Sequence, residues 1–166
     1  WEQQLPAETP THFIYNVSSD ELAGVQALLE TENAKSSQWF PMVRGRLVKI
    51  NGEAITRERM RQSDGLSREV NFTQSDTLPN TNEIIAGQWW EPTEQLNEFS
   101  IESDVAGEIG LEVGDEVEFS VGGLTFSSTL SSIRKVDWQS MNPNFYIIFS
   151  PGTLDQYAPN WVSSIQ

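Results

Sequence analysis

The sequence predicts an α+β fold in which a small, mostly β unit is inserted into a larger α/β part. Three observations lead to this prediction. The first half combines strand patterns with one amphipathic helix pattern. A polar, turn-rich stretch, QSDTLPNTNE, then indicates a boundary, and a glycine-punctuated run of short strands follows it. A nearly continuous apolar run at 144–150 indicates a strand buried on both faces, which we expect to rejoin the first part.

The first half opens with a strand and a helix. Residues 12–18, HFIYNVS, have a strand pattern. Ser18 and Glu21 have the spacing of a capping box, which predicts a helix over about 19–33. The apolar residues of this helix share one face, so we expect it to cover a sheet. They are Leu22, Val25, Leu28 and Leu29.

Asn51 and Gly52 lie between two β-rich runs and are the strongest hairpin signal in the chain. A two-residue turn pairs the flanking residues symmetrically and leaves little freedom for the strands to slip. The expected pairs are Val48 with Ile55, Arg46 with Arg57, and Arg44 with Arg59. Arginines opposed in this way repel one another unless anions lie between them.

The basic residues are concentrated around this hairpin. Seven of the ten lie between Val43 and Arg68, against three acids, although the whole chain has a net charge of −14. Two explanations stay open: carboxylates of the same chain neutralise the patch, or it docks an acidic partner or an anionic lipid headgroup. We therefore treat four residues as a candidate partner-binding surface: Arg44, Arg46, Arg57 and Arg59.

The glycines of the stretch AGEIGLEVGDEVEFSVGGLTF, residues 106–126, are expected to serve turns and caps. Their spacing is not that of a phosphate-binding loop, the charged neighbours are acidic, and no lysine lies near. Gly110 is placed to end a short helix that starts at Ser103 or Asp104. Gly122 and Gly123 are placed to turn one strand into the next. The sequence therefore predicts no nucleotide site and no cofactor.

Trp89 and Trp90 are the second candidate contact. Adjacent residues on a strand point to opposite faces, so we expect only one of the two to enter the core. The other would pack at the junction between the two parts or contact a ligand or partner.

Catalytic and metal sites find little support in the composition. The chain has one histidine, His12, and no cysteine, so a histidine-rich metal site and a thiolate site are both excluded. A catalytic pair of carboxylates stays open, because 24 acidic residues bring some of them close together. The net charge of −14 argues against nucleic acid as a partner. We predict a non-enzymatic protein without a metal.

Several segments together resemble a known family. The stretch IESDVAGEIGLEVGDEVEFSVGGLTFSSTLSSIRKVDW, preceded by EIIAGQWW, resembles the periplasmic core domain of MacB/FtsX-type ABC transporter permeases. The segments VRGRLVKINGE, SDTLP, KVDWQSMNPNF and PGTLDQY resemble more closely the YbbP-like branch, which is associated with a periplasmic lysophospholipase/thioesterase. The resemblance covers nearly the whole chain.

The resemblance implies a porter-like α/β subdomain formed by 1–82 with 139–166, and an inserted sabre-like β subdomain at 83–138. It implies a non-catalytic periplasmic domain of a bacterial inner-membrane permease. Such a domain couples ATP-driven motion to the extraction or handover of a hydrophobic or lipid-linked substrate. The implied partners are a cytoplasmic ATPase subunit, reached through the membrane part, and the periplasmic lysophospholipase/thioesterase.

The ends of the sequence suggest a piece of a longer chain. It starts at Trp1 rather than Met, and Trp161, Val162 and Ile165 have the spacing of one helix face, as if a helix were beginning there. The alternative is an independent secreted enzyme or carbohydrate-binding module that uses surface carboxylates. Hydropathy of the parent gene separates the two, because only a permease has transmembrane helices on both sides of this piece.

Overall fold

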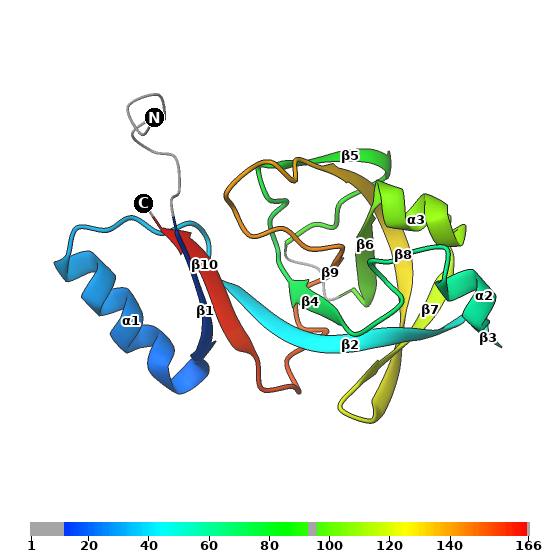
Figure 1. Cartoon of the computed structure of the whole chain (residues 1–166), viewed down its shortest axis with the longest axis horizontal. Coiled ribbons are helices and arrows are strands. Elements are labelled where there is room, and N and C mark those ends of the chain that lie inside the picture. The colour runs from blue at the N-terminus through cyan, green and yellow to red at the C-terminus, as the bar shows by residue number, and fades with distance from the viewer. Residues whose placement is uncertain (1–11, 93–95, 166) are drawn as a thin grey trace.

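The computed structural model describes residues 12–92 and 96–165 and shows a strand-rich α+β fold (Figure 1). The strands are β1 His12–Ser18, β2 Phe40–Ile50, β3 Glu53–Ala54, β4 Val70–Gln74, β5 Asn82–Gly87, β6 Glu98–Glu102, β7 Glu116–Val121, β8 Leu124–Val136, β9 Ile147–Phe149 and β10 Asn160–Ile165. The helices are α1 Ser19–Thr31, α2 Arg57–Met60 and α3 Ser103–Ile109.

Six of the strands close into a barrel. The order around it is β2–β4–β9–β6–β8–β7, and β7 pairs with β2 to complete the circle. The β4–β9 and β6–β8 pairs are parallel and the others are antiparallel. β8 is long enough to pair with β7 along its first half and with β5 along its second. Closure leaves the barrel strands with few free edges.

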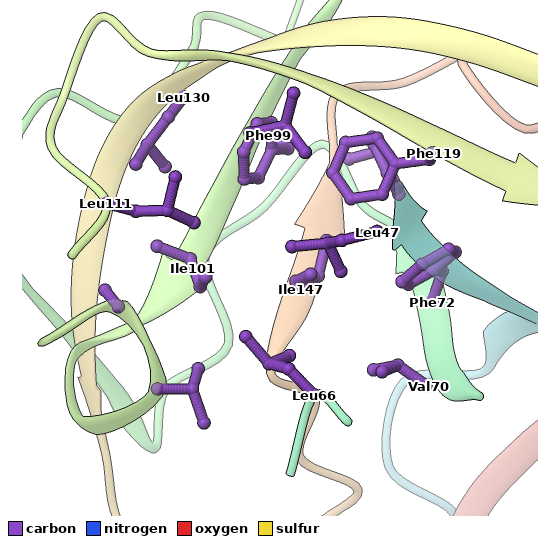
Figure 2. Close-up of a cluster of buried hydrophobic side chains, with 14 of the residues drawn as sticks. Leu47, Leu66, Val70, Phe72, Phe99, Ile101, Leu111, Phe119, Leu130 and Ile147 are labelled. Atoms are coloured by element: carbon purple, nitrogen blue, oxygen red, sulfur yellow. The ribbon is translucent and has the colours of Figure 1, made fainter. Parts of the chain in front are cut away.

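Phenylalanine rings fill the barrel. Phe119 lies edge-to-face against Phe72, Phe99 and Phe149, with ring centroids 5.3, 5.1 and 4.8 Å away. All four are fully buried. Figure 2 shows side chains from several strands converging on this interior, which α3 helps to cover with buried Val105, Ala106 and Ile109. Such edge-to-face contacts favour one ring arrangement over others and so help to specify the core.

A second layer lies beside the barrel and is joined to it by β2. The first residues of β2, Phe40 to Met42, pair with β10, and β10 pairs in turn with β1 (Figure 1). The following residues of β2, Val43 to Gly45, pair with β4 in the barrel. One strand therefore belongs to both layers.

The strands of the barrel come from both sides of the expected division at residues 83 and 138. β2, β4 and β9 come from the flanking ranges, and β6, β7 and β8 come from within 83–138. The two ranges thus contribute three strands each to one barrel. A family division of the chain into two subdomains remains a prediction.

The predicted strand at 12–18 and the helix that follows it are present. The strand at 12–18 has the predicted bounds, and the Ser18–Glu21 capping box is formed at the start of α1. The helix contacts β1 and β10, yet none of its residues is fully buried and Leu28 is 61% exposed. The helix therefore covers the sheet with only part of the predicted face, which is Leu22, Val25 and Leu29.

The predicted C-terminal helix is wrong. Residues 160–165 form β10, which pairs with β1 on one side and β2 on the other. The buried hydroxyl of Ser163 donates a hydrogen bond to the Ser37 carbonyl oxygen. Val162 packs into a small apolar cluster, whose buried members are Phe40, Trp90, Phe145, Ile148 and Val162. Pairing on two edges overrides a helical spacing that only three residues suggested.

The hairpin prediction is correct at the turn and wrong beyond it. Asn51 and Gly52 have φ values of 50° and 82°, as a type I′ turn requires. Pairing follows the predicted register at Ile50–Glu53 and Lys49–Ala54, and one further hydrogen bond joins Ile55 N–H to the carbonyl of Val48. The predicted arginine pairs do not form. Arg46 lies opposite Ser120 of β7, and Arg44 lies opposite Asn71 of β4.

Two features end this hairpin early. The Thr56 hydroxyl accepts a hydrogen bond from Arg59 N–H and so caps α2, which turns the chain away from β2. β4 occupies the edge of β2 from Val43 to Gly45, where a longer return strand would have to lie.

Candidate functional site

The four predicted arginines are separated by the fold. Arg59 donates from Nε to the Ile109 carbonyl oxygen at 2.7 Å and from Nη2 to the Gly110 carbonyl oxygen at 3.4 Å. It therefore caps the C-terminal end of α3, where a cation is favoured by the helix dipole. Arg44 lies with Nε 3.8 Å from Glu69 Oε2, and both side chains are about two-thirds exposed. Such exposed pairs contribute little to stability.

Arg46 and Arg57 line one groove, together with Arg68. We call this the arginine groove, and its volume is about 440 Å³. The remaining lining residues are Leu47, Val48, Ile55, Met60, Leu66, Ser67 and Glu69. Within the described ranges, no hydrogen bond or ion pair is found for the side chains of these three arginines, so no carboxylate of this part of the chain pairs with them directly. Arg68 was not among the four predicted arginines, yet it lines this groove, whereas Arg44 and Arg59 do not.

As expected, only one of the two tryptophans is buried in the core, but the two rings do not point to opposite faces. Their rings are 4.1 Å apart, because residues 88–90 follow β5 without strand geometry. Trp90 is buried in the small apolar cluster and donates from Nε1 to the Ser75 carbonyl oxygen at 2.9 Å. Trp89 is half-buried and donates to the Asp76 carbonyl oxygen at 2.9 Å. Both rings thus hold the loop after β4, and only Trp89 offers surface for a contact.

A second groove was not predicted from the sequence. We call it the aromatic groove; it has a volume of about 540 Å³ and lies between β1, β2, β10 and the segment before β9. Its apolar lining residues are Phe13, Tyr15, Met42, Trp138, Met141, Pro143, Phe145 and Val162. Tyr15 is 62% exposed, Trp138 46% and Met141 39%. Large apolar side chains that stay this exposed and this close together are typical of ligand or partner sites.

One signal in the sequence could have indicated part of this groove, namely two aromatic residues spaced two apart on the first strand. Phe13 and Tyr15 share one face of β1. Trp138 and Met141 come from a segment with no regular pattern, and only the fold shows that it lies opposite β1.

A buried arginine supports the segment before β9. Arg134 is fully buried on β8 and donates to Asn82 Oδ1 at 2.7 Å and to the Ser100 side chain and carbonyl oxygen. It also donates to the carbonyl oxygens of Phe145 and Tyr146, at 3.0 and 2.9 Å. Burial lowers the pKa of Arg134 to about 9, and the nearby Glu102 carboxylate opposes this shift. Because all five N–H groups have acceptors, we assign it a structural role.

Glu102 is the other buried charged residue near α3. Its Oε1 accepts a hydrogen bond of 2.9 Å from Val105 N–H and caps the helix. Burial raises the pKa of this carboxyl group above its ordinary value, and the hydrogen bond from Val105 works against that rise. The group is held inside the fold and does not line either groove.

No metal-binding cluster is found among residues 12–92 and 96–165, where no three His, Asp or Glu side chains come together. His12 begins β1, as the sequence predicted. In the same ranges, no helix is both long and apolar enough to cross a bilayer.

No protein-family model matches the chain. Over all 166 residues the chain is 35% identical to an uncharacterized ABC transporter permease, YbbP, of Escherichia coli (strain K12). The chain spans 20% of the length of that relative. It is therefore related, from end to end, to a segment of an ABC transporter permease.

Proposed function

We propose that this chain is a non-catalytic periplasmic domain of an ABC transporter permease subunit. The observation that carries the proposal is the 35% identity to a permease segment over the full chain. An ABC permease works with an ATPase subunit, which in this proposal is cytoplasmic and is reached through the membrane part. The domain itself then has no nucleotide to bind, and its task is to couple ATP-driven motion to movement of a substrate.

The aromatic groove supports a hydrophobic or lipid-linked substrate. Its exposed Tyr15, Trp138 and Met141 side chains offer apolar surface that a water-soluble ligand would not need. Extraction or handover of such a substrate requires apolar surface outside the membrane to shield it from water. Handover to a periplasmic lysophospholipase/thioesterase belongs to the same proposal.

The architecture supports a porter-like assignment for one part of the fold. The β1–α1–β10 layer is an α/β unit that meets the barrel through β2 (Figure 1). In the proposal, residues 1–82 and 139–166, which include this layer, form the porter-like part. Residues 83–138 form the sabre-like part. The described residues form no metal-binding cluster, and the glycine spacing is not that of a nucleotide-binding loop. The proposal assigns no chemical reaction to the domain.

Accessibility of one cysteine tests the location. The chain has no native cysteine, and Leu124 at the β7–β8 turn is 61% exposed. In the full-length parent protein, with any other cysteines replaced, Leu124→Cys should react with a membrane-impermeant maleimide equally well in intact and lysed cells. A cysteine in the ATPase subunit, which should react only after lysis, is the control.

Two outcomes contradict the proposal. Labelling of Leu124→Cys only after lysis would place the domain in the cytoplasm. Release of the chain as a free secreted protein, with hydrolytic turnover abolished by one carboxylate-to-amide change, would favour a secreted enzyme.

A further inference from the structure

The arginine groove combines two kinds of surface. Its apolar floor is formed by the half-buried side chains of Val48, Ile55 and Met60, and Ile55 and Met60 pack against the barrel core. Its rim carries the exposed side chains of Arg46, Arg57 and Arg68, against one carboxylate, Glu69. Glu69 already faces Arg44, which lies outside the groove lining.

The unpaired charges make the groove unusual for this chain. The net charge is −14, yet the side chains of the three rim arginines have no hydrogen-bond or ion-pair partner among the described residues. Cations held near one another without counterions repel, so an anion placed between them gains from all three. Guanidinium groups also bind carboxylates and phosphates through paired hydrogen bonds, which makes the rim selective for those groups.

The floor decides which anion fits. An inorganic anion would leave the apolar floor in contact with water, whereas a hydrocarbon chain attached to the anion would cover it. A volume of about 440 Å³ is within the range of small-molecule sites. An acidic protein surface is flatter and more polar than this lining, so it would use the rim and leave the floor uncovered.

From this geometry we infer that the arginine groove binds an anionic amphiphile, a carboxylate or phosphate that carries a hydrocarbon chain. The anionic group is held by Arg46, Arg57 and Arg68, and the chain lies over Val48, Ile55 and Met60. This site is distinct from the aromatic groove, with which it shares no lining residue. The inference concerns binding alone and holds whether or not the domain serves a transporter.

Calorimetric titration of the 166-residue chain tests the inference, with dodecyl phosphate below its micelle concentration as the probe. Each of two partial probes should bind at least about tenfold more weakly than dodecyl phosphate, since each lacks half of the recognition. Inorganic phosphate lacks the hydrocarbon chain, and dodecyl maltoside, also used below its micelle concentration, has the same hydrocarbon chain without the charge.

Paired substitutions locate the site. Arg57→Gln with Arg68→Gln should weaken dodecyl phosphate binding by about tenfold or more, because charge-assisted hydrogen bonds are lost. Arg61→Gln with Lys135→Gln removes two charges from exposed positions outside the groove and should change binding less than about twofold. Thermal unfolding of both variants should match the wild type, which shows that any loss of binding is local.

The following results overturn the inference. Equal binding of inorganic phosphate would indicate a plain anion site, and equal binding of dodecyl maltoside would indicate a plain apolar site. Unchanged binding in the Arg57/Arg68 variant would place the amphiphile elsewhere, in particular in the aromatic groove. Tighter binding of poly-glutamate than of dodecyl phosphate, lost in the same variant, would assign the rim to an acidic protein partner.

Discussion

The guanidinium of Arg59 donates a hydrogen bond of 2.7 Å to the carbonyl oxygen of Ile109. The two residues are 50 positions apart, and the bond joins α2 to the C-terminal end of α3. This contact stabilises the fold at a position where the charge pattern predicted a partner surface. Arginines close together in sequence thus serve different purposes here.

Replacing Arg59 should therefore destabilise the fold. Arg59→Ala is expected to lower the free energy of unfolding by about 1 kcal/mol, through the lost hydrogen bonds and the lost cation at the helix end. Arg57→Ala, on the same short helix, should change it by less than about 0.5 kcal/mol. Urea denaturation followed by far-UV circular dichroism measures both, and equal losses would contradict the assignment.

Arg134 should be the most sensitive charged position of the barrel. Arg134→Met removes the guanidinium donors from Asn82 Oδ1 and from the carbonyl oxygens of Ser100 and Phe145, and should cost about 3–5 kcal/mol of unfolding free energy. Lys135→Met, one position along the strand and exposed, should cost less than about 0.5 kcal/mol. If Arg134→Met does not fold, its yield in soluble form beside that of Lys135→Met is the measurement. A loss below about 1 kcal/mol would show that water replaces the guanidinium.

Two glycines should respond in opposite directions to alanine. A Cβ at Gly45 would lie 2.5 Å from the Ser120 carbonyl oxygen and 2.6 Å from the ring of Phe72. Gly45→Ala is therefore expected to destabilise the barrel by about 1–3 kcal/mol. A Cβ at Gly24, within α1, would have no atom within 4 Å. Gly24→Ala should stabilise the fold by about 0.5–1 kcal/mol in thermal unfolding, because alanine is the better helix former.

The buried Glu102 should make stability depend on pH. Because its pKa is raised in the folded state, the folded protein keeps this proton at pH values where the unfolded chain has lost it. The contribution of Glu102 to stability is thus fully present below its unfolded pKa, which is about 4.3. It is lost as the pH rises through the folded value. Glu102→Gln keeps an acceptor for Val105 N–H and removes the titration.

The difference in unfolding free energy between Glu102→Gln and the wild type should consequently shift in favour of the variant as the pH rises from about 4.3 through the raised pKa that Glu102 has in the folded protein. Urea titrations at several pH values between 4 and 8 give both curves. A difference that stays constant with pH would contradict the buried-carboxyl account.

The aromatic groove should bind an apolar probe. We expect 1-N-phenylnaphthylamine to fluoresce more strongly with the wild-type chain than with Tyr15→Ser combined with Met141→Ser. Leu28→Ser removes an equally exposed apolar side chain from α1, outside the groove, and should leave the signal unchanged. Equal loss in both variants would show that the probe responds to exposed apolar surface in general.

Local signals in the sequence predicted local structure well. The Ser18–Glu21 capping box, the left-handed Gly110 at the end of α3 and the Asn51–Gly52 turn are all present. Each is decided within a few residues by backbone geometry or by one hydrogen bond. The alternation at Val117, Phe119 and Val121 also identified the buried face of β7.

Predictions that needed distant partners were less successful. The hairpin ends early because β4, from elsewhere in the chain, occupies the edge of β2. β10 is a strand because β1 and β2 lie on both of its sides, which no spacing near Trp161 could reveal. The aromatic groove depends on Tyr15 and Met141 meeting across the fold, and the hydrogen bond of Arg59 to α3 depends on the barrel closing.

The pairing of β1 with β10 has a mechanical consequence. His12 lies opposite Ile165, so the first and last described ends leave the sheet side by side. Tension between these ends would load the ladder one hydrogen bond at a time, as in unzipping, and would not shear all the bonds together. Strands pulled in this way separate at low force. The barrel would feel the pull only after β10 had also parted from Phe40, Pro41 and Met42 at the start of β2.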